Sequence, residues 1–328
     1  MTKKIVIAHR GACGYLPEHS MEAKAMAHAM NADFIEQDVV MTKDDRLVVL
    51  HDHFLDGVTN VATVFPKRAR TDGRFYVIDF TFKEIQSLQM TEAFDSPDNP
   101  IYPERFPIWK CRFKVHSLEQ EIELIQGLNK SRGKNIGIYP EIKAPAFHRF
   151  EGKDISIALL TTLKEYGYKT KTDAIYLQCF DPLELQRIKF ELFEQFDIQL
   201  KLVQLIAETA WCETCAYENG EIVNYDYNWM FESGAMQQVS HYADGIGPWF
   251  PQVVDDASTA ENLIFTPLVK AAHQHNLVVH PFTFRHDKGE IPLYAKDFNT
   301  FLDIFYIKAD VNGVFTDFPD LAVAFLNQ

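Results

Sequence analysis

The sequence of 328 residues predicts a single α/β domain folded as an eight-fold (βα) barrel of the TIM type. Eight apolar segments rich in β-branched residues alternate with helical patterns, which is typical of parallel strands connected by helices. A hydrophobic content of 47% is enough for a large core. A doubly wound open sheet is the main alternative, and it is disfavoured because no G-x-G-x-x-G motif opens a helix.

The first fifty residues predict two strands, the helix between them and a returning strand. Residues 5–8 (IVIA) are apolar and end in a turn at Gly11. Ser20 begins a helix over 20–30, and FIEQDVVM gives a second strand over 33–41. After a turn at 43–45, residues 46–52 (RLVVLHD) run back as the other half of a hairpin.

The remaining elements follow in regular order. Strands are predicted over 137–144, 174–180, 199–206, 243–249, 277–284 and 313–318. Helices are predicted over 117–130, 154–166, 182–196, 234–242, 267–275, 295–308 and 321–327. Ser117 and Gln120 have the spacing of a capping box, and Pro182 suits the first turn of its helix.

Two segments interrupt this alternation. Residues from about 53 to 116 contain five prolines and few periodic runs, and a segment of this length is usually functional or a small subdomain. Residues 207–232, rich in Tyr, Trp and Asn, form a second excursion. We therefore expect one barrel domain over 1–328 with an insertion after the second-strand hairpin.

Composition limits the partners of the protein. The net charge of −14 disfavours nucleic acid and anionic membrane, and an anionic substrate would need local cations to hold it. No run of eighteen apolar residues exists, so we expect no membrane span. The chain opens MTKKIVIA without the apolar segment of a signal peptide, which predicts a cytoplasmic protein if Met1 is the true start. The sequence leaves open whether the chain forms a homodimer.

The cysteines give no strong signal for a metal site or a disulfide framework. There are five: Cys13, Cys111, Cys179, Cys212 and Cys215. Cys212-x-x-Cys215 lacks the second pair that a zinc site needs, and we favour plain thiols over a tight disulfide. Cys13 lies near His9, yet we interpret it as a small loop residue and not as a nucleophile.

Two carboxylates share one face of the second strand. Glu36 and Asp38 are two residues apart, and the apolar neighbours Ile35, Val39 and Val40 indicate a buried strand. Burying both charges is costly unless a cation lies between them, and a divalent ion with oxygen ligands is the simplest compensation. The alternative is an exposed edge strand with two solvated acids.

Histidines and cations lie close to this pair in the sequence. His9 and His51 can act as base and acid near neutral pH, and Arg10 offers a bidentate fork for phosphate. Glu141-x-Lys143 repeats the same-face arrangement, so Glu141 could complete a three-carboxylate metal site and Lys143 could contact phosphate. A simple Glu–Lys pair on a wet strand is the alternative. Together these residues suggest attack on a phosphate ester.

The pattern resembles the glycerophosphodiester phosphodiesterase family, closest to its periplasmic bacterial branch. The resemblance covers nearly the whole chain and rests on seven segments in order: His9-Arg10-Gly11, Glu36-x-Asp38, His51-Asp52, YPEIKAP (139–145), YLQCFD (176–181), LVVHPFT (277–283) and GVFTDFPD (313–320). It implies metal-dependent hydrolysis of glycerophosphodiesters to sn-glycerol 3-phosphate and an alcohol. It also implies a periplasmic location if a leader has been removed.

The resemblance further implies roles for the site residues. Glu36, Asp38 and Glu141 would bind the divalent ion, with calcium favoured and magnesium as the alternative. His9 and His51 would act as acid and base while the glycerol 2-hydroxyl attacks phosphorus, which gives a cyclic phosphate that water opens. The insertion over 53–116 would lie over the barrel mouth and shape a small pocket for glycerol.

Other interpretations stay open at this point. A phospholipase D-like enzyme acting on lysolipids would need an apolar channel for an acyl chain, and a non-catalytic binding protein could use the same scaffold. His51-x-His53 also fits metal-dependent amidohydrolases, but their pair closes the first strand. Three aromatic residues near strand ends are weaker candidates for the substrate pocket: Phe180, Trp249 and Phe282.

Overall fold

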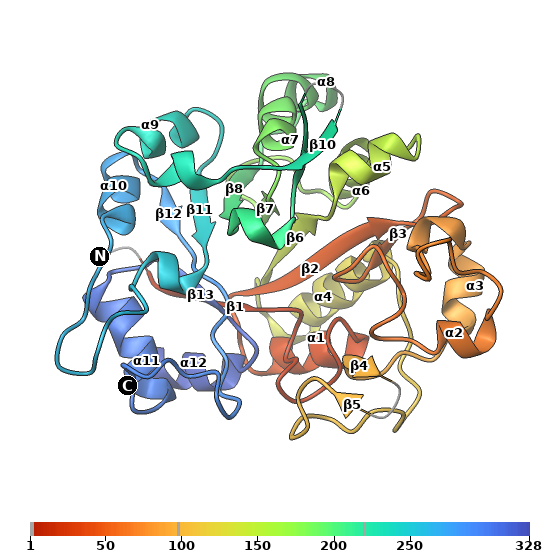
Figure 1. Ribbon diagram of the computed structural model, residues 1–328, viewed down its shortest axis with the longest axis horizontal. Helices are drawn as coiled ribbons and strands as arrows, with labels where there is room; N and C mark the ends of the chain where they lie inside the picture. Colours follow the sequence, from red (N-terminus) through yellow and green to blue (C-terminus); the bar gives the residue numbers. More distant parts are fainter. Residues whose placement is uncertain (1–2, 97–98, 219–220) are drawn as a thin grey trace.

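The computed structural model describes residues 3–96, 99–218 and 221–328, and eight parallel strands form its centre (Figure 1). In chain order these strands are β1 (Ile5–Ala8), β2 (Phe34–Met41), β6 (Gly137–Ile142), β7 (Tyr176–Cys179), β8 (Lys201–Ile206), β11 (Gly245–Pro248), β12 (Val278–Val279) and β13 (Gly313–Thr316). Neighbours pair in the order β12-β11-β8-β7-β6-β2-β1-β13, and every step is parallel. The predicted eight-fold barrel is confirmed.

Backbone hydrogen bonds bring the first and last strands of this path together. The Asn312 amide donates to the Val279 carbonyl at 2.9 Å, and the Phe315 amide donates to the Pro281 carbonyl at 3.0 Å. The predicted strand over 277–284 is only partly regular, because β12 ends two residues before Pro281, which has no N–H to donate to a ladder. The ring is therefore nearly closed.

Helices cover the outside of the strands in Figure 1. They are α1 (Met21–Ala29), α4 (Leu118–Arg132), α5 (Pro145–Phe150), α6 (Ile155–Glu165), α7 (Pro182–Arg187), α8 (Phe193–Phe196), α9 (Ala235–Ser240), α10 (Leu268–Gln274), α11 (Phe298–Asp303) and α12 (Pro319–Leu326). The two long predicted helices over 182–196 and 295–308 each contain a π-helical turn, at Ile188–Leu192 and Ile304–Lys308. Ser20 caps α1, and Ser117 and Gln120 form the predicted capping box of α4.

The interior of the barrel is filled by a small cluster of large side chains. Ile7, Tyr139, Val203 and Phe315 come from four different strands and are at most 1% exposed. The Tyr139 hydroxyl lies 2.9 Å from Nδ1 of His280. This layer packs the interior of the barrel.

The segment after the hairpin builds short elements around a core of its own. β3 (Leu47–Val49) pairs antiparallel with β2, and then come α2 (Val61–Val64), a 3₁₀ turn at Val77–Asp79, α3 (Phe82–Ser87), β4 (Phe94–Ser96) and β5 (Asn99–Pro100). Val48 and Leu50 pack with Phe80, Met90 and Val115 in this second apolar cluster. The insertion is thereby anchored on the hairpin that leads to His51.

The second excursion is a two-stranded hairpin between two 3₁₀ turns. β9 (Cys215–Glu218) pairs antiparallel with β10 (Glu221–Asn224), and the turns span Thr209–Trp211 and Asn228–Phe231. The five cysteines, all among the described residues, are free thiols, as favoured for Cys212 and Cys215. Among these described residues, no helix combines the length and apolar character that crossing a membrane requires.

Candidate active site

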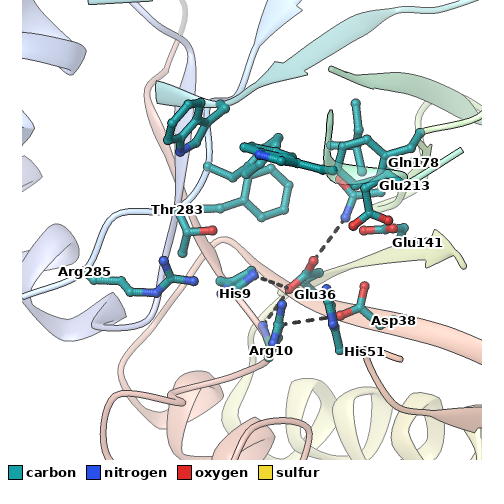
Figure 2. A pocket seen from close by; sticks show the side chains of 16 residues that line it. His9, Arg10, Glu36, Asp38, His51, Glu141, Gln178, Glu213, Thr283 and Arg285 are labelled. Atoms are coloured by element: carbon teal, nitrogen blue, oxygen red, sulfur yellow. Dashed lines mark hydrogen bonds and ion pairs between the residues drawn. The ribbon is translucent and has the colours of Figure 1, made fainter. Parts of the chain in front are cut away.

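A cavity of about 210 Å³ opens at the carboxyl ends of the barrel strands (Figure 2). Its wall includes His9 and Arg10 after β1, Glu36 and Asp38 on β2, and His51 after β3. A second cavity of about 620 Å³ shares the same His9, Arg10 and His51, and its outer wall comes mainly from the insertion. The site therefore lies where the barrel and the insertion meet.

Three carboxylates from two neighbouring strands meet in the first cavity. Asp38 on β2 pairs in register with Glu141 on β6, and Glu36 lies on the same face as Asp38. One ligand oxygen from each lies within 4.8 Å of the others, and all three residues are at most 5% exposed. Oδ1 of Asp38 is buried without a hydrogen-bond partner in the described structure. An unpartnered carboxylate oxygen in an all-oxygen cluster fits a hard divalent cation.

The electrostatics of this cluster also favour a cation. Burial, with the charge of Asp38 beside it, raises the pKa of Glu36 to about 8. Burial likewise raises the pKa of Glu141, against the attraction of Lys143. Although burial opposes it, a hydrogen bond from His19 and the cation of Lys143 hold the pKa of Asp38 well below its usual range. All three groups ionise together only if positive charge enters the cluster.

His9 is held in one tautomer by Asp317. Its Nδ1 lies 2.6 Å from Oδ1 of Asp317, and a carboxylate can only accept, so Nδ1 carries the ring hydrogen. Nε2 is left as a free base 4.0 Å from Oε2 of Glu36. Burial, reinforced by Arg10, lowers the pKa of His9 to about 4 even though Asp317 acts to raise it. The ring is therefore neutral near pH 7 and able to take a proton.

His51 is the more accessible of the two histidines. Its side chain is 30% exposed, against 9% for His9. Nδ1 lies 2.8 Å from Oδ1 of the neighbouring Asp52, and Nε2 is 3.4 Å from the ammonium of Lys143. The chain thus brings both predicted histidines to one cavity, with His51 on its solvent side.

The two predicted phosphate-binding cations differ in position. Arg10 lines the cavity, with its guanidinium 2.7 Å from Glu18 and its backbone N–H donating to Glu36 at 2.7 Å. Gly11 follows at φ 92°, and a Cβ there would lie 2.9 Å from the carbonyl carbon of Ala23, which explains the glycine of the H-R-G motif. Lys143 is not among the wall residues of the cavity, because its ammonium turns to Glu141 at 2.9 Å.

Aromatic side chains form the opposite wall of the cavity in Figure 2. The three candidates Phe180, Trp249 and Phe282 line this cavity, together with Trp211 from the second excursion. Phe180 packs edge-on against Phe282 at 5.8 Å, and Trp211 against Trp249 at 5.1 Å. A polar wall of carboxylates therefore faces an apolar wall of rings.

Sequence reasoning missed several residues of the site. Asp317 directly follows the last strand, in the TDFPD segment, and the rule that functional residues lie at the carboxyl ends of barrel strands could have found it. Arg285 donates to Asp317 at 3.0 Å, and Gln178 donates to Glu36 at 3.2 Å. No local signal marks Arg105, which reaches Asp317 from the insertion at 2.6 Å.

Comparison with known proteins shows which family the chain resembles. The model of the glycerophosphoryl diester phosphodiesterase family matches residues 9–321. A glycerophosphodiester phosphodiesterase of Haemophilus influenzae is 57% identical, covering 98% of this chain and 90% of the relative. One of Treponema pallidum is 43% identical, covering 100% and 93%.

Solved structures agree on the fold. A phosphodiesterase of Oleispira antarctica, in complex with the product sn-glycerol-3-phosphate, gives a TM-score of 0.63 at 17% identity and covers 99% of this chain and 97% of that one. The glycerophosphodiester phosphodiesterase of Thermotoga maritima gives 0.57 at 18% identity, covering 99% of each chain. At these identities the likeness concerns the barrel alone. The family match and the two closely similar relatives carry the conclusion that the chain belongs to the glycerophosphoryl diester phosphodiesterase family.

Proposed function

We propose that this glycerophosphodiester phosphodiesterase hydrolyses its substrates to sn-glycerol 3-phosphate and an alcohol with the help of a divalent metal ion. The metal is supported by the unpartnered Oδ1 of Asp38, a residue that offers one ligand oxygen within 4.8 Å of those from Glu36 and Glu141. All the offered ligands are oxygens and no His or Cys belongs to the cluster, which fits a hard cation such as calcium or magnesium. The resemblance to the bacterial branch of the family favours calcium, and magnesium is the alternative. A bound ion would neutralise charge that develops on the phosphate oxygens.

The protein residues then divide the proton transfers between them. His9, neutral and with a free Nε2, takes the proton of the glycerol 2-hydroxyl as that oxygen attacks phosphorus. His51, on the more open side, gives a proton to the oxygen of the leaving alcohol. The P–O bond to the alcohol breaks as the new bond forms, and the resulting cyclic phosphate is opened by water. Arg10 on the cavity wall orients the phosphate.

The lysolipid alternative fits this site less well. An acyl chain needs an apolar channel, but the wide second cavity has charged side chains on its wall, among them Glu18, Asp52 and Arg74. The aromatic wall belongs to the smaller cavity of about 210 Å³, which suits a small polyol. A purely binding protein has no need for the paired histidines.

The decisive experiment compares glycerophosphocholine with an analogue whose glycerol lacks the 2-hydroxyl. We expect the analogue to be almost inert, because the nucleophile is gone. We also expect excess chelator to stop choline release until calcium is restored.

His9→Ala and His51→Ala should each lower kcat by about 10²–10⁴-fold. The matched control is His241→Ala, a change at an exposed histidine. Comparable rates for the two substrates would mean that water attacks directly. Full activity in excess chelator, with no metal found by elemental analysis, would refute the proposal that the reaction needs a metal ion.

A further inference from the structure

A buried lysine lies directly behind the carboxylate cluster. Lys24 on α1 is 0% exposed, and its ammonium meets three acceptors: the backbone carbonyl of Glu36, Oε1 of Glu121 at 3.1 Å and Nδ1 of His19 at 3.1 Å. An ammonium has three N–H donors and no acceptor, so each donor has a partner. Figure 1 shows α1 and α4, which carry Lys24 and Glu121, beside β2.

These contacts decide where the hydrogen of His19 lies. Because Lys24 can only donate, Nδ1 of His19 must accept and therefore carries no hydrogen. The hydrogen of the neutral ring is then on Nε2, which lies 2.8 Å from Oδ2 of Asp38. Nε2–H donates to Oδ2, and Oδ1 of the same carboxylate has no hydrogen-bond partner among the described residues. The Asp38 carboxylate also belongs to the cluster with Glu36 and Glu141.

We propose that Lys24 is a positioning residue, which fixes the tautomer of His19 and thereby presents Oδ1 of Asp38 to the metal ion. This inference rests on the metal site of the proposed function. With the other tautomer, a lone pair on Nε2 of His19 would face Oδ2 of Asp38, and this hydrogen bond would be lost. Oδ2 would keep only the more distant ion pair with Nε of Arg10, at 3.6 Å, among its contacts with the described residues. Lys24 also donates to the backbone carbonyl of Glu36. It therefore contacts Glu36 directly and Asp38 through the His19 ring.

The alternative is that Lys24 has no effect on the metal site and only balances the buried charge of Glu121. Glu121 has two further partners, since His116 lies 2.7 Å and Gln37 2.8 Å from its oxygens. Glu121→Gln removes that charge but still offers an oxygen to Lys24. Lys24→Met added to Glu121→Gln removes the ammonium without leaving a buried carboxylate unpaired. The pair of variants therefore separates tautomer control from charge balance.

The test measures calcium affinity by isothermal titration calorimetry. We expect Glu121→Gln to bind calcium like the wild type, and Lys24→Met/Glu121→Gln to bind it about ten-fold more weakly or worse, as for other residues that orient a metal ligand. The same step is repeated in a His19→Gln background. The glutamine amide supplies a donor near the place of Nε2 and has no tautomer, so the effect of Lys24→Met should vanish there.

A second readout needs neither the Lys24 nor the Glu121 variant. Histidine-labelled ¹⁵N NMR of the wild type should show the ring hydrogen of His19 on Nε2, with the signal assigned by its loss in His19→Gln. A hydrogen on Nδ1 overturns the inference. Equal calcium affinity of Glu121→Gln and Lys24→Met/Glu121→Gln overturns it as well, while leaving the metal site intact. A wild-type protein that binds no divalent ion would overturn the metal site and this inference together.

Discussion

Asp317 joins His9, the proposed base, to two arginines through its two oxygens. Oδ1 accepts from Nδ1 of His9, and Oδ2 accepts from Arg105 at 2.6 Å and Arg285 at 3.0 Å. Burial opposes ionisation, but these cations, with His9, hold the pKa of Asp317 well below its usual range. A carboxylate placed in this way fixes the free nitrogen of His9 toward the substrate, as the acid does in hydrolytic triads.

Asp317→Asn should therefore lower kcat by about 10²-fold or more with little change in KM. The oxygen of the new amide is its only acceptor and will bond to the two arginines. Its NH₂ group will then face His9. A donor at Nδ1 moves the ring hydrogen to Nε2, where it blocks the base. Steady-state kinetics on glycerophosphocholine measure this effect. Asp320→Asn on α12, whose acid bonds to Tyr15, is the matched control. A kcat within two-fold of the wild type would contradict this role of Asp317.

Glu92 is a buried acid that the proposed chemistry does not use. It is 1% exposed, and its Oε2 has no hydrogen-bond partner among the described residues. Burial, with Glu18 nearby, raises its pKa to about 8, above the ordinary value of 4.5. The folded state therefore holds a proton that the unfolded state loses, and the stability that this proton contributes is present below pH 4.5 and lost as the pH rises through 8.

Glu92→Gln should remove that pH dependence. We expect the melting temperature of the wild type to fall more between pH 5 and pH 9 than that of the variant, so that the variant becomes the more stable of the two at pH 9. Differential scanning calorimetry at both pH values gives the comparison. Parallel curves for the two proteins would show that Glu92 is solvated or paired in solution.

At the scale of elements, Arg105 ties the insertion to the barrel. Its guanidinium bonds to Asp287 at 2.7 and 2.9 Å, to Asp317 at 2.6 Å and to the carbonyl of Cys13 at 3.2 Å. These partners lie after β12, after β13 and after β1. One planar group from the insertion thus holds three of the loops that surround His9.

Arg105→Ala should lower kcat more than it changes KM, because it loosens Asp317 and hence His9 without touching the substrate wall of aromatic rings. Arg105→Lys should restore little, since an ammonium cannot span three acceptors with the fork of a guanidinium. Kinetics of both variants, with the exposed Arg112→Ala of the same insertion as control, measure the effect. Equal loss in Arg112→Ala would mean that the insertion is merely destabilised.

The elements that the sequence predicted well are those with strong local signals. Short apolar segments rich in β-branched residues, and capping residues such as Ser20 and Ser117, can be recognised within one element. The barrel strands and their helices were predicted from these local signals. The short helices and bridges of the insertion were not predicted, because four to six residues give too little periodicity. Pro281 broke the predicted seventh strand, although the chain continues alongside its neighbours.

At the scale of the whole molecule, local signals predicted some residues of the site and missed others. Glu36 and Asp38 could be placed together because two residues on one strand share a face. Asp317 lies 308 residues from His9, and only the closure of the barrel brings β13 next to β1. His19 and Lys24 also gave no local sign of their role, because it depends on contacts with β2. A local sequence pattern cannot predict the role of a residue that depends on partners far away in the sequence.

With the proposed calcium site, the acidic cluster would link the stability of the whole fold to calcium and pH. Without metal, burial and Asp38 raise the pKa of Glu36 to about 8 from an ordinary 4.5. The stability that the protonated group contributes is therefore lost as the pH rises through 8. A bound cation needs Glu36 ionised, so binding at pH 5.5 must first release a proton, whereas at pH 8.5 little remains to be released.

The same free calcium concentration should therefore raise the melting temperature more at pH 8.5 than at pH 5.5. Binding to the folded state alone stabilises it by RT ln(1 + [L]/Kd), and Kd falls as the competing proton leaves. Calorimetric melting at both pH values, with and without calcium, gives the two gains. Glu36→Gln, which carries no ionisable group at that position, should show a smaller gain with much less dependence on pH. A wild-type gain that is equal at the two pH values, or larger at pH 5.5, would mean that Glu36 is already ionised in the metal-free protein and that its proton does not compete with calcium.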